Sequence, residues 1–487
     1  MTQTVTSRHS EEISVDDYRG YAGLSPLAGL LSMKDATTKG LTVTESVERI
    51  KRIRWALKRL HMAFIARIPS MPVYELKMAF SLHAFYCSEH IGVFAKRVTE
   101  MRQPPYGLEV SPDPMLDVFF DEVLGAPSTE ALVLGLYEKA LPAVIRALEN
   151  LMADTNKMFD HPTYRICRFT LLELQEAVEY GIEALNCLVK DADRAELAGW
   201  LATLDRILAA TGDVDGREPK SGETVARQFS VTPYKYDPVP KRDERFIDPY
   251  NMGVNAEALL FDPETEPLPK TIMLYFKRMR EIDVPEMMSS ILFEETGKPW
   301  DYYRDMTRQL WDEARHAMMG EVGFVSLGID WTKIPFNFTW SLGLNTILTA
   351  KERHGVLFTI EQGLMPRKGG KENEWEIGVA TADPLTARIQ DYDWADEVLH
   401  ARIGKDWFVP QIGTQVEAMA YGDRVWNKVL VDWKKWKEDG LTEHRNWWPE
   451  VYLAACKHWG TEPDAKLLGY NKTYENARAD LKEVVAG

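Results

Sequence analysis

The stretch Pro299–Phe324 reads PWDYYRDMTRQLWDEARHAMMGEVGF, and the rest of the chain can be interpreted outward from it. No Pro or Gly interrupts residues 300–319, so a helix is predicted here. Glu313 and His316 are three residues apart and therefore share one face of that helix. A carboxylate and an imidazole on a buried face are costly unless they have partners. A metal ion is the favoured partner, because helical bundles hold pairs of metals with Glu-x-x-His elements and single glutamates.

A second element of the same kind lies further along the chain. Glu397 and His400 again form a Glu-x-x-His pair, and an Asp precedes the Glu in both elements, at Asp312 and at Asp396. One such pair occurs by chance on many surface helices. Two copies with the same preceding Asp favour a metal site on the inner faces of two helices.

Single glutamates complete the predicted ligand set, one on each of two further helices. Glu361 ends an apolar run and stands 36 residues before Glu397 (397 − 361), and Glu281 stands 32 residues before Glu313 (313 − 281). Two antiparallel helices joined by a turn return to the same depth after about this length, given a rise of ~1.5 Å per residue. The four glutamates are therefore expected at one level of a bundle.

Two residues compete for the ligand position on the first helix. Glu281 is level with Glu313 when the turn at 296–299 is taken as the midpoint, whereas Glu286 lies closer to that turn. Pro285 lies between the two candidates and would kink the helix, which could change the carboxylate that points inward. The sequence leaves this choice open.

Composition limits the classes of function. The chain has 487 residues and a net charge of −16 that is spread along its length, which disfavours nucleic acid and anionic membranes as partners. The first residues contain no apolar signal core and no run of 18 apolar residues occurs, so a cytoplasmic protein is expected. The four cysteines are scattered without a Cys-x-x-Cys pair, so reduced thiols are expected.

Helical periodicity and its interruptions predict an all-α protein built of several parts. Residues 210–240 are rich in Gly, Thr, Lys and Pro and indicate a linker, and a polar, Gly-rich loop is expected at 367–376. The tryptophans of the last part are expected to pack helices against the bundle. The predicted parts are an N-terminal arm at 1–43, a helical bundle at 44–209, a linker at 210–267, a second bundle at 268–410 and a Trp-rich helical extension at 411–487.

The two halves of the chain resemble each other in sequence. Asp160–Ile166 (DHPTYRI) matches Asp383–Ile389 (DPLTARI) at an offset of 223 (386 − 163), and Glu138 matches Glu361 at the same offset. A repeated supersecondary unit fixes the architecture of a chain. We therefore expect two tandem four-helix bundles that arose by internal duplication.

The two copies differ in their chemistry. At the offset of 223, Glu397 corresponds to Leu174 and His400 corresponds to Ala177, and these apolar side chains cannot bind a metal. The N-terminal copy is therefore expected to be degenerate and to have lost its metal. The alternative is a different site within that copy, built from Glu89, Glu173 and Glu176.

Over about residues 270–410 the chain resembles the ferritin-like di-metal carboxylate superfamily. Residues 50–190 resemble it more weakly, as a degenerate copy. The Asp-Glu-x-Arg-His sequence at 312–316 is similar to the motif of bacterial multicomponent monooxygenases and related di-iron oxidases. The resemblance implies two iron ions, or iron with manganese, that activate dioxygen to oxidise a small organic substrate. Because no nucleotide-binding motif stands out, the electrons would come from a separate donor or from the substrate. Since the two similar halves could pack as a pseudo-dimer, a monomer or homodimer is expected.

The same resemblance implies roles for the residues around the ligands. Asp396 would orient His316 and Asp312 would orient His400, which is the outer contact that fixes the tautomer and direction of a ligand imidazole. Arg315 would pair with such a buried Asp.

Other positions separate this chain from subgroups of the superfamily. Ribonucleotide reductase small subunits place a radical Tyr about two turns after the first Glu-x-x-His glutamate, where this chain has Gly320, so a tyrosyl radical is not expected. Arylamine N-oxygenases carry an extra His four residues before the last ligand Glu, and here that position is Asp393, a further candidate ligand. His354 lies two turns before Glu361 and is either a substrate contact or a core residue.

The sequence therefore predicts a non-haem di-iron oxygenase or oxidase. Iron oxidation and storage, or a metal that only holds the bundle together, are the alternative functions. The candidate metal ligands are Glu281, Glu286, Glu313, His316, Glu361, Asp393, Glu397 and His400, and the candidate supporting residues are Asp312, Arg315 and Asp396.

Overall fold

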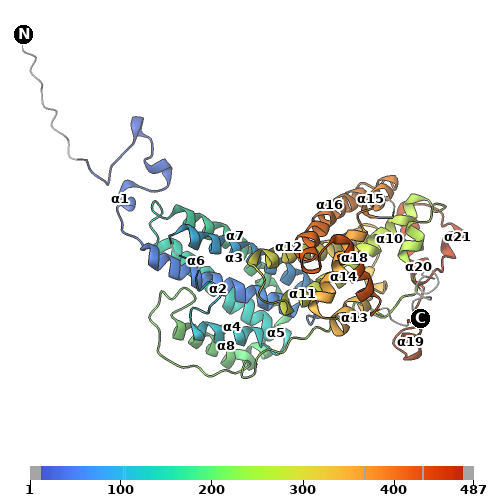
Figure 1. The fold of residues 1–487 in the computed structure, drawn as a ribbon, viewed down its shortest axis with the longest axis horizontal. Helices are drawn as coiled ribbons and strands as arrows, with labels where there is room; N and C mark the ends of the chain where they lie inside the picture. Colours follow the sequence, from blue (N-terminus) through green and yellow to red (C-terminus); the bar gives the residue numbers. More distant parts are fainter. Residues whose placement is uncertain (1–12, 103, 105, 367–368, 430–432, 475–487) are drawn as a thin grey trace, which may run out of the picture. The chain divides into compact units, whose positions relative to one another are not determined.

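The computed structural model describes residues 13–102, 104, 106–366, 369–429 and 433–474, and the regular structure within these residues is entirely helical (Figure 1). The expectation of an all-α protein is confirmed. No helix of the described residues has both the length and the apolar character needed to cross a membrane. The predicted N-terminal arm and C-terminal extension lie partly outside the described residues.

The chain forms two compact units. Unit 1 contains the residues up to 60 and residues 89–234, and unit 2 contains residues 61–88 and the residues from 235 onward. The contacts thus group residues 61–88 with the later part of the chain, whereas the sequence analysis placed them in the first bundle.

Long helices make up most of both units. The helices up to residue 211 are η1 (Tyr21–Gly23), η2 (Leu27–Gly29), α1 (Met33–Ala36), α2 (Val43–Arg67), α3 (Tyr74–Glu100), α4 (Pro114–Leu124), α5 (Thr129–Val133), η3 (Leu134–Ala140, a π-helix), α6 (Leu141–Asp154), α7 (His161–Leu188) and α8 (Asp191–Thr211). Residues 212–255, all of which are described, contain no helix.

The later helices all belong to unit 2. They are α9 (Ala256–Leu260), α10 (Pro267–Arg280), α11 (Asp283–Glu294), α12 (Trp300–Ser326), η4 (Trp331–Lys333), α13 (Thr339–Ile347), α14 (Ala350–Gly363), α15 (Lys371–Ala380), α16 (Pro384–Trp407), α17 (Val409–Ile412), α18 (Gln415–Trp426), α19 (Trp433–Glu438), α20 (Trp448–Trp459) and α21 (Ala465–Leu468).

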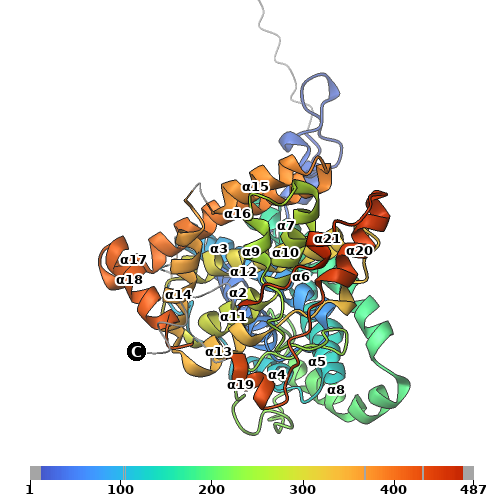
Figure 2. The same cartoon turned by 90° about the vertical axis from the view of Figure 1, so that its right-hand side faces the viewer.

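Four of these helices close a ring of contacts in unit 2. Helix α11 packs on α12, α12 on α16, α16 on α14, and α14 on α11. Helix α10, which precedes α11 in the chain, packs along α12 outside this ring. Helix α15 lies against both α10 and α16 (Figure 2). Because each of the four helices has two neighbours in the ring, side chains that point inward share one interior.

Two glycines on α12 allow α10 to approach closely. A Cβ atom on Gly320 would lie 2.2 Å from the backbone nitrogen of Met279, and one on Gly323 would lie 2.4 Å from the ring of Tyr275. Real Cβ atoms do not approach other atoms this closely, so no side chain fits at either position. The contact brings Glu281, at the end of α10, next to the Glu-x-x-His element of α12.

Helix α10 ends where the sequence predicted a kink. Pro285 has no N–H group and cannot donate to the carbonyl of Glu281. That carbonyl instead accepts a hydrogen bond of 2.9 Å from the backbone N–H of Val284, and Glu281 becomes the C-cap of α10. Glu286 falls on the next helix, α11, so the two candidate ligands belong to different helices.

The matched heptapeptides begin a long helix in each unit. Asp160 is the N-cap of α7 and Asp383 is the N-cap of α16, and a Pro occupies the first turn of both helices. The Asp side chain accepts the backbone N–H of Thr163 at 3.3 Å in α7 and of Thr386 at 3.2 Å in α16. The repeated sequence therefore performs the same capping function twice.

The polar segment at 367–376 differs from its prediction. A loop was expected throughout, but helix α15 begins at Lys371, while 367 and 368 lie outside the described residues. The side chains of Lys371 and Glu374 are buried, because their charges are paired inside unit 2. In the extension, Trp447 and Trp448 are part of the apolar core, as expected for packing residues.

Candidate metal centre

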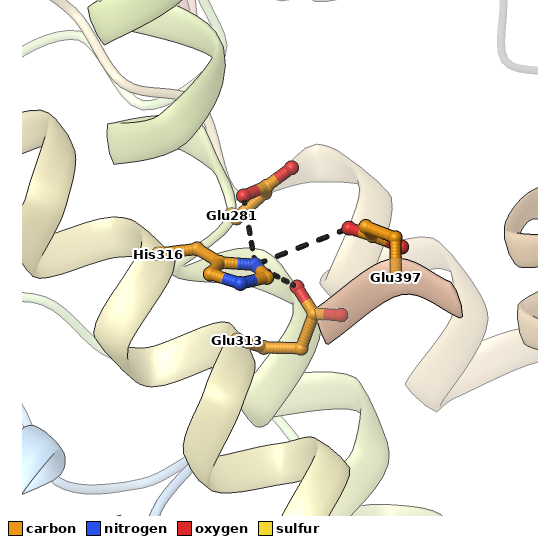
Figure 3. Close-up of side chains that lie close together, drawn as sticks. All are labelled: Glu281, Glu313, His316 and Glu397. Carbon is orange, nitrogen blue, oxygen red and sulfur yellow. Dashed lines mark ion pairs between the residues drawn. The ribbon is translucent and has the colours of Figure 1, made fainter. Parts of the chain in front are cut away.

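Six side chains from α10, α12, α14 and α16 converge inside unit 2. They form two overlapping groups, and within each group one donor atom per residue lies within 4.8 Å of the others. The first group is Glu281, Glu313, His316 and Glu397 (Figure 3), and the second is Glu313, Glu361, Glu397 and His400. All except Glu281, which is half-buried, are buried. All six are candidate ligands predicted from the sequence.

Two glutamates belong to both groups and divide their oxygens between the two histidines. Glu313 places Oε2 3.6 Å from Nδ1 of His316 and Oε1 3.0 Å from Nδ1 of His400. Glu397 places Oε1 3.9 Å from Nδ1 of His316 and Oε2 3.6 Å from Nδ1 of His400. Each of these carboxylates therefore presents one oxygen toward each histidine of the cluster.

The outer nitrogens of both imidazoles face aspartates. Nε2 of His316 lies 3.2 Å from Oδ2 of Asp396, and Nε2 of His400 lies 3.4 Å from Oδ2 of Asp312. A carboxylate at Nε2 favours a proton on that nitrogen and leaves Nδ1, the atom facing the cluster, free to bind a metal. These are the pairs that the family resemblance implied.

One guanidinium joins the two aspartates. Nη2 of Arg315 donates to Oδ1 of Asp312 and, at 2.7 Å, to Oδ2 of Asp396, and Nε of Arg308 donates to Asp312 at 2.9 Å. Burial by itself would raise the pKa of Asp312, but its bonds to His400 and these cations hold the pKa well below its usual range. Asp312 therefore stays ionised as the acceptor for the His400 ring.

The crowded carboxylates require positive charge. Burial and the neighbouring charge of Glu397 raise the pKa of Glu361 well above its usual range. Burial opposes protonation of His316, yet Asp396, Glu281 and Glu313 outweigh it and raise the His316 pKa to about 10. Both shifts favour protonation, as expected where several carboxylates are packed together out of contact with water.

Several buried donor atoms at the cluster have no hydrogen-bond partner among the described residues. They are Nδ1 of His316 and His400, and Oε2 of Glu281 and Glu397. Such orphaned atoms are expensive inside a protein. Nitrogen and carboxylate oxygen are suitable ligands for iron, manganese and other divalent metals, so the residues present could hold metal ions.

Glu286 lies in a separate buried ion cluster. It pairs with Lys77, and Nη2 of Arg242 lies 3.0 Å from its Oε2. Arg242 also pairs with Asp283, and Glu286 belongs to neither donor group. The geometry thus favours Glu281 over Glu286 as the ligand from the first corner of the ring.

Asp393 lies beside the first donor group without belonging to it. Its Oδ1 is 3.5 Å from Nδ1 of His316. The carboxylate already forms an ion pair with Arg278, and Nζ of Lys371 donates to its Oδ1 at 3.0 Å and to its Oδ2 at 3.1 Å. Because two cations already engage its carboxylate, Asp393 is a weaker candidate for a metal ligand than the members of the donor groups.

Lys371 and Arg278 are residues of the site that sequence reasoning missed. Nζ of Lys371 lies 2.9 Å from Oε1 of Glu397 and 3.4 Å from Oε1 of Glu281, and Nη2 of Arg278 lies 3.0 Å from the same Glu281 oxygen. Lys371 sits in a polar segment that looks like a surface loop, and Arg278 sits among other basic residues, so neither carried a local signal.

A cavity of about 710 Å³ opens onto the cluster within unit 2. Its wall includes Glu281, Glu313, Glu361 and Glu397. Further wall residues are mainly apolar or aromatic, among them Leu357, Ile360, Leu364, Phe261, Trp340, Trp426 and Trp436. The indole N–H of Trp340 has no acceptor in the described part of the chain. This volume falls in the range of small-molecule sites.

His354 is a core residue and not a member of the cluster. It is buried between the rings of Tyr302 and Phe408, at centroid distances of 5.9 and 5.1 Å. Burial lowers its pKa to about 3, so the ring is neutral at ordinary pH.

The corresponding region of unit 1 has a different construction. Nε2 of His90 lies 2.6 Å from Oε2 of Glu173, and Nδ1 lies 3.1 Å from the hydroxyl of Thr170, so both ring nitrogens are engaged. Leu174 and Ala177 are buried on α7. Among the described residues of unit 1, no three acidic, His or Cys side chains converge as those of unit 2 do.

A scan against protein-family models and searches of curated proteins and of solved structures return no match for this chain. The class of the protein therefore follows from its own fold and site. It is a helical protein whose buried Glu and His clusters could hold metal ions.

Proposed function

We propose that this protein is a non-haem di-iron oxygenase or oxidase with a ferritin-like bundle in unit 2. The observation that carries the proposal is the pair of donor groups that share Glu313 and Glu397. One ion would be held by Glu281 and His316, the other by Glu361 and His400, and both by the shared glutamates. Four carboxylates offset the four charges of two divalent ions.

The bound ions would support the activation of dioxygen and the oxidation of a substrate. A carboxylate-rich iron pair, or iron with manganese, would pass electrons from a separate donor or from the substrate to dioxygen and would supply the oxidising power that acts on the substrate. The chain's own contribution is to position the ligands and to exclude water. Asp312 and Asp396 hold the two imidazoles in one orientation, and the apolar wall of the cavity keeps water from competing with the substrate.

The cavity supports an organic substrate over iron storage. Iron ions need only a narrow polar path, whereas about 710 Å³ with three tryptophans in the wall suits a small, largely apolar molecule. Trp340 would offer its indole N–H to an acceptor atom of that molecule. Iron oxidation remains the second candidate function, and a purely structural metal is the third.

We also propose that unit 1 descends from the same bundle by duplication. The capping heptapeptides of α7 and α16 support a common origin. The replacement of a Glu and a His by the buried Leu174 and Ala177 supports the loss of the metal from the first copy.

The test is anaerobic reconstitution of the metal-free protein with ferrous iron, followed by elemental analysis and by oxygen-electrode measurements. Two irons per chain and oxygen uptake that accelerates with an organic substrate are the expected results, with the surface variant Glu376→Ala as the control. Mineral formation without organic turnover would favour iron storage. Iron that binds without oxygen uptake would favour a structural metal, and absence of binding would refute the proposal.

A further inference from the structure

The two halves of the donor set differ in the charges around them. We name the half at Glu281 and His316 the His316 side, and the half at Glu361 and His400 the His400 side. On the His400 side, the neutral amide of Gln309 donates to Oε1 of Glu361 at 3.1 Å.

Cations contact the His316 side. Lys371 lies 2.9 Å from Oε1 of Glu397, which is the oxygen that this glutamate turns toward His316. Lys371 and Arg278 lie 3.4 and 3.0 Å from Oε1 of Glu281. The glutamate oxygen that faces His400, Oε2 of Glu397, has no such contact among the described residues.

The cations on the His316 side are engaged by several carboxylates. Among the described residues, Arg278, Lys277 and Lys371 form ion pairs with two carboxylates outside the donor set, Asp393 and Glu374, and Lys277 also acts on the charge of Glu257. Arg278 and Lys371 pair in addition with the donor carboxylates Glu281 and Glu397. Arg278 and Lys371 are buried, so water screens their charges poorly.

A metal ion on the His316 side therefore meets a competitor. It must share Oε1 of Glu397 with an ammonium group that already contacts this atom, and it must share Oε1 of Glu281 with Lys371 and Arg278. Among the described residues, the side chain that donates to Glu361 on the His400 side is Gln309, which is neutral. We propose that Lys371 makes the two metal positions unequal, so that the His400 side fills first and the His316 side fills only at higher metal concentration.

This inference rests on the proposed metal pair but not on any reaction of it. The test is an anaerobic titration of the metal-free full chain with Mn²⁺, in which electron paramagnetic resonance counts the free ion. Wild-type protein is expected to bind two ions whose dissociation constants differ at least tenfold. His400→Ala should remove the tight event, and His316→Ala should remove the weak one.

Lys371→Met removes the ammonium and keeps most of the side-chain volume. We expect it to tighten the weak event at least tenfold and to change the tight event by less than about twofold, since tenfold corresponds to only ~1.4 kcal/mol. Lys270→Met is the matched control, because Lys270 is also buried in unit 2 but its ammonium donates to the carbonyl of Asp262 at 2.8 Å. This control should leave both events unchanged.

The outcomes distinguish the role of Lys371 from the existence of the metal pair. Two equal sites in the wild type, or a weak event that Lys371→Met leaves unchanged, would overturn the role of Lys371 while the metal pair stands. No binding of Mn²⁺ or ferrous iron at all would overturn the metal pair itself. If circular dichroism shows that Lys371→Met does not fold, the two histidine variants still test the order of filling, and loss of the tight event in His316→Ala would overturn the proposal.

Discussion

Nδ1 of His400 lies 3.0 Å from Oε1 of Glu313, although the two residues belong to different helices, α16 and α12. The second oxygen of Glu313 faces the other histidine, so this side chain links both halves of the cluster. The consequences for metal content can be measured directly.

Loss of a shared glutamate should abolish the binding of both metal ions. Glu313→Ala is expected to reduce bound iron from two per chain to near zero, because each ion loses a ligand and the link between them. Glu361→Ala should leave one iron, since Glu361 belongs to one group only. Elemental analysis after desalting measures both, with the exposed Glu376→Ala as control. Equal losses in the two glutamate variants would contradict the shared-ligand arrangement.

Removal of an outer aspartate should weaken metal binding without removing a ligand. Asp396→Asn leaves His316 without its carboxylate acceptor, so we expect the metal affinity to fall ~10–100-fold. Asp301→Asn is the matched control, because Asp301 lies exposed on the same helix as His316. Competition with a metal chelator measures the affinity. An unchanged affinity in Asp396→Asn would mean that the aspartate does not orient the ring.

The contact at Gly320 should tolerate no side chain. Gly320→Ala drives a Cβ against the backbone of Met279, which cannot move like a flexible side chain, and we expect a loss of ~1–3 kcal/mol in the free energy of unfolding. Gly199→Ala in α8 is the control, because nothing lies within 4 Å of its added Cβ. It should be neutral or stabilising by up to ~1 kcal/mol. Urea denaturation of both variants tests the difference.

The buried His354 should make stability depend on pH. Its pKa is about 3 in the folded protein against 6.5 in an unfolded chain, so the unfolded state binds more protons in between. Stability is therefore retained above pH 6.5 and falls as the pH drops toward 3, with a slope that approaches ~1.4 kcal/mol per pH unit.

A difference measurement isolates that histidine. Urea midpoints of the metal-free protein between pH 6.5 and 5 should fall less steeply in His354→Leu than in the wild type. The exposed His458→Leu should follow the wild-type slope. Parallel slopes in all three proteins would show that His354 is not held neutral by its surroundings.

The features of the site that sequence could predict are those fixed by one helix. The three-residue spacing of Glu313 and His316, and of Glu397 and His400, sets a shared face whatever the rest of the chain does. The same holds for the capping heptapeptides, whose Asp and Pro act locally. The all-α class followed from the same periodicity.

The remaining features depend on contacts between distant segments. The choice of Glu281 over Glu286 follows from the close approach at Gly320 and from the ion pairs of Glu286 with Lys77 and Arg242, neither of which a single sequence displays. Lys371 belongs to a segment whose polar composition is typical of a solvated loop. Its burial becomes visible only when α15 is placed against α10 and α16.

The donors come from four helices spread over a long segment of the chain, and this affects when the protein can acquire metal during synthesis. A nascent chain that ends before α16 contains Glu281, Glu313, His316 and Glu361 but lacks Glu397 and His400. The complete donor set exists only after the ribosome has released residue 400. Loading with metal is therefore a step that follows translation of most of the protein.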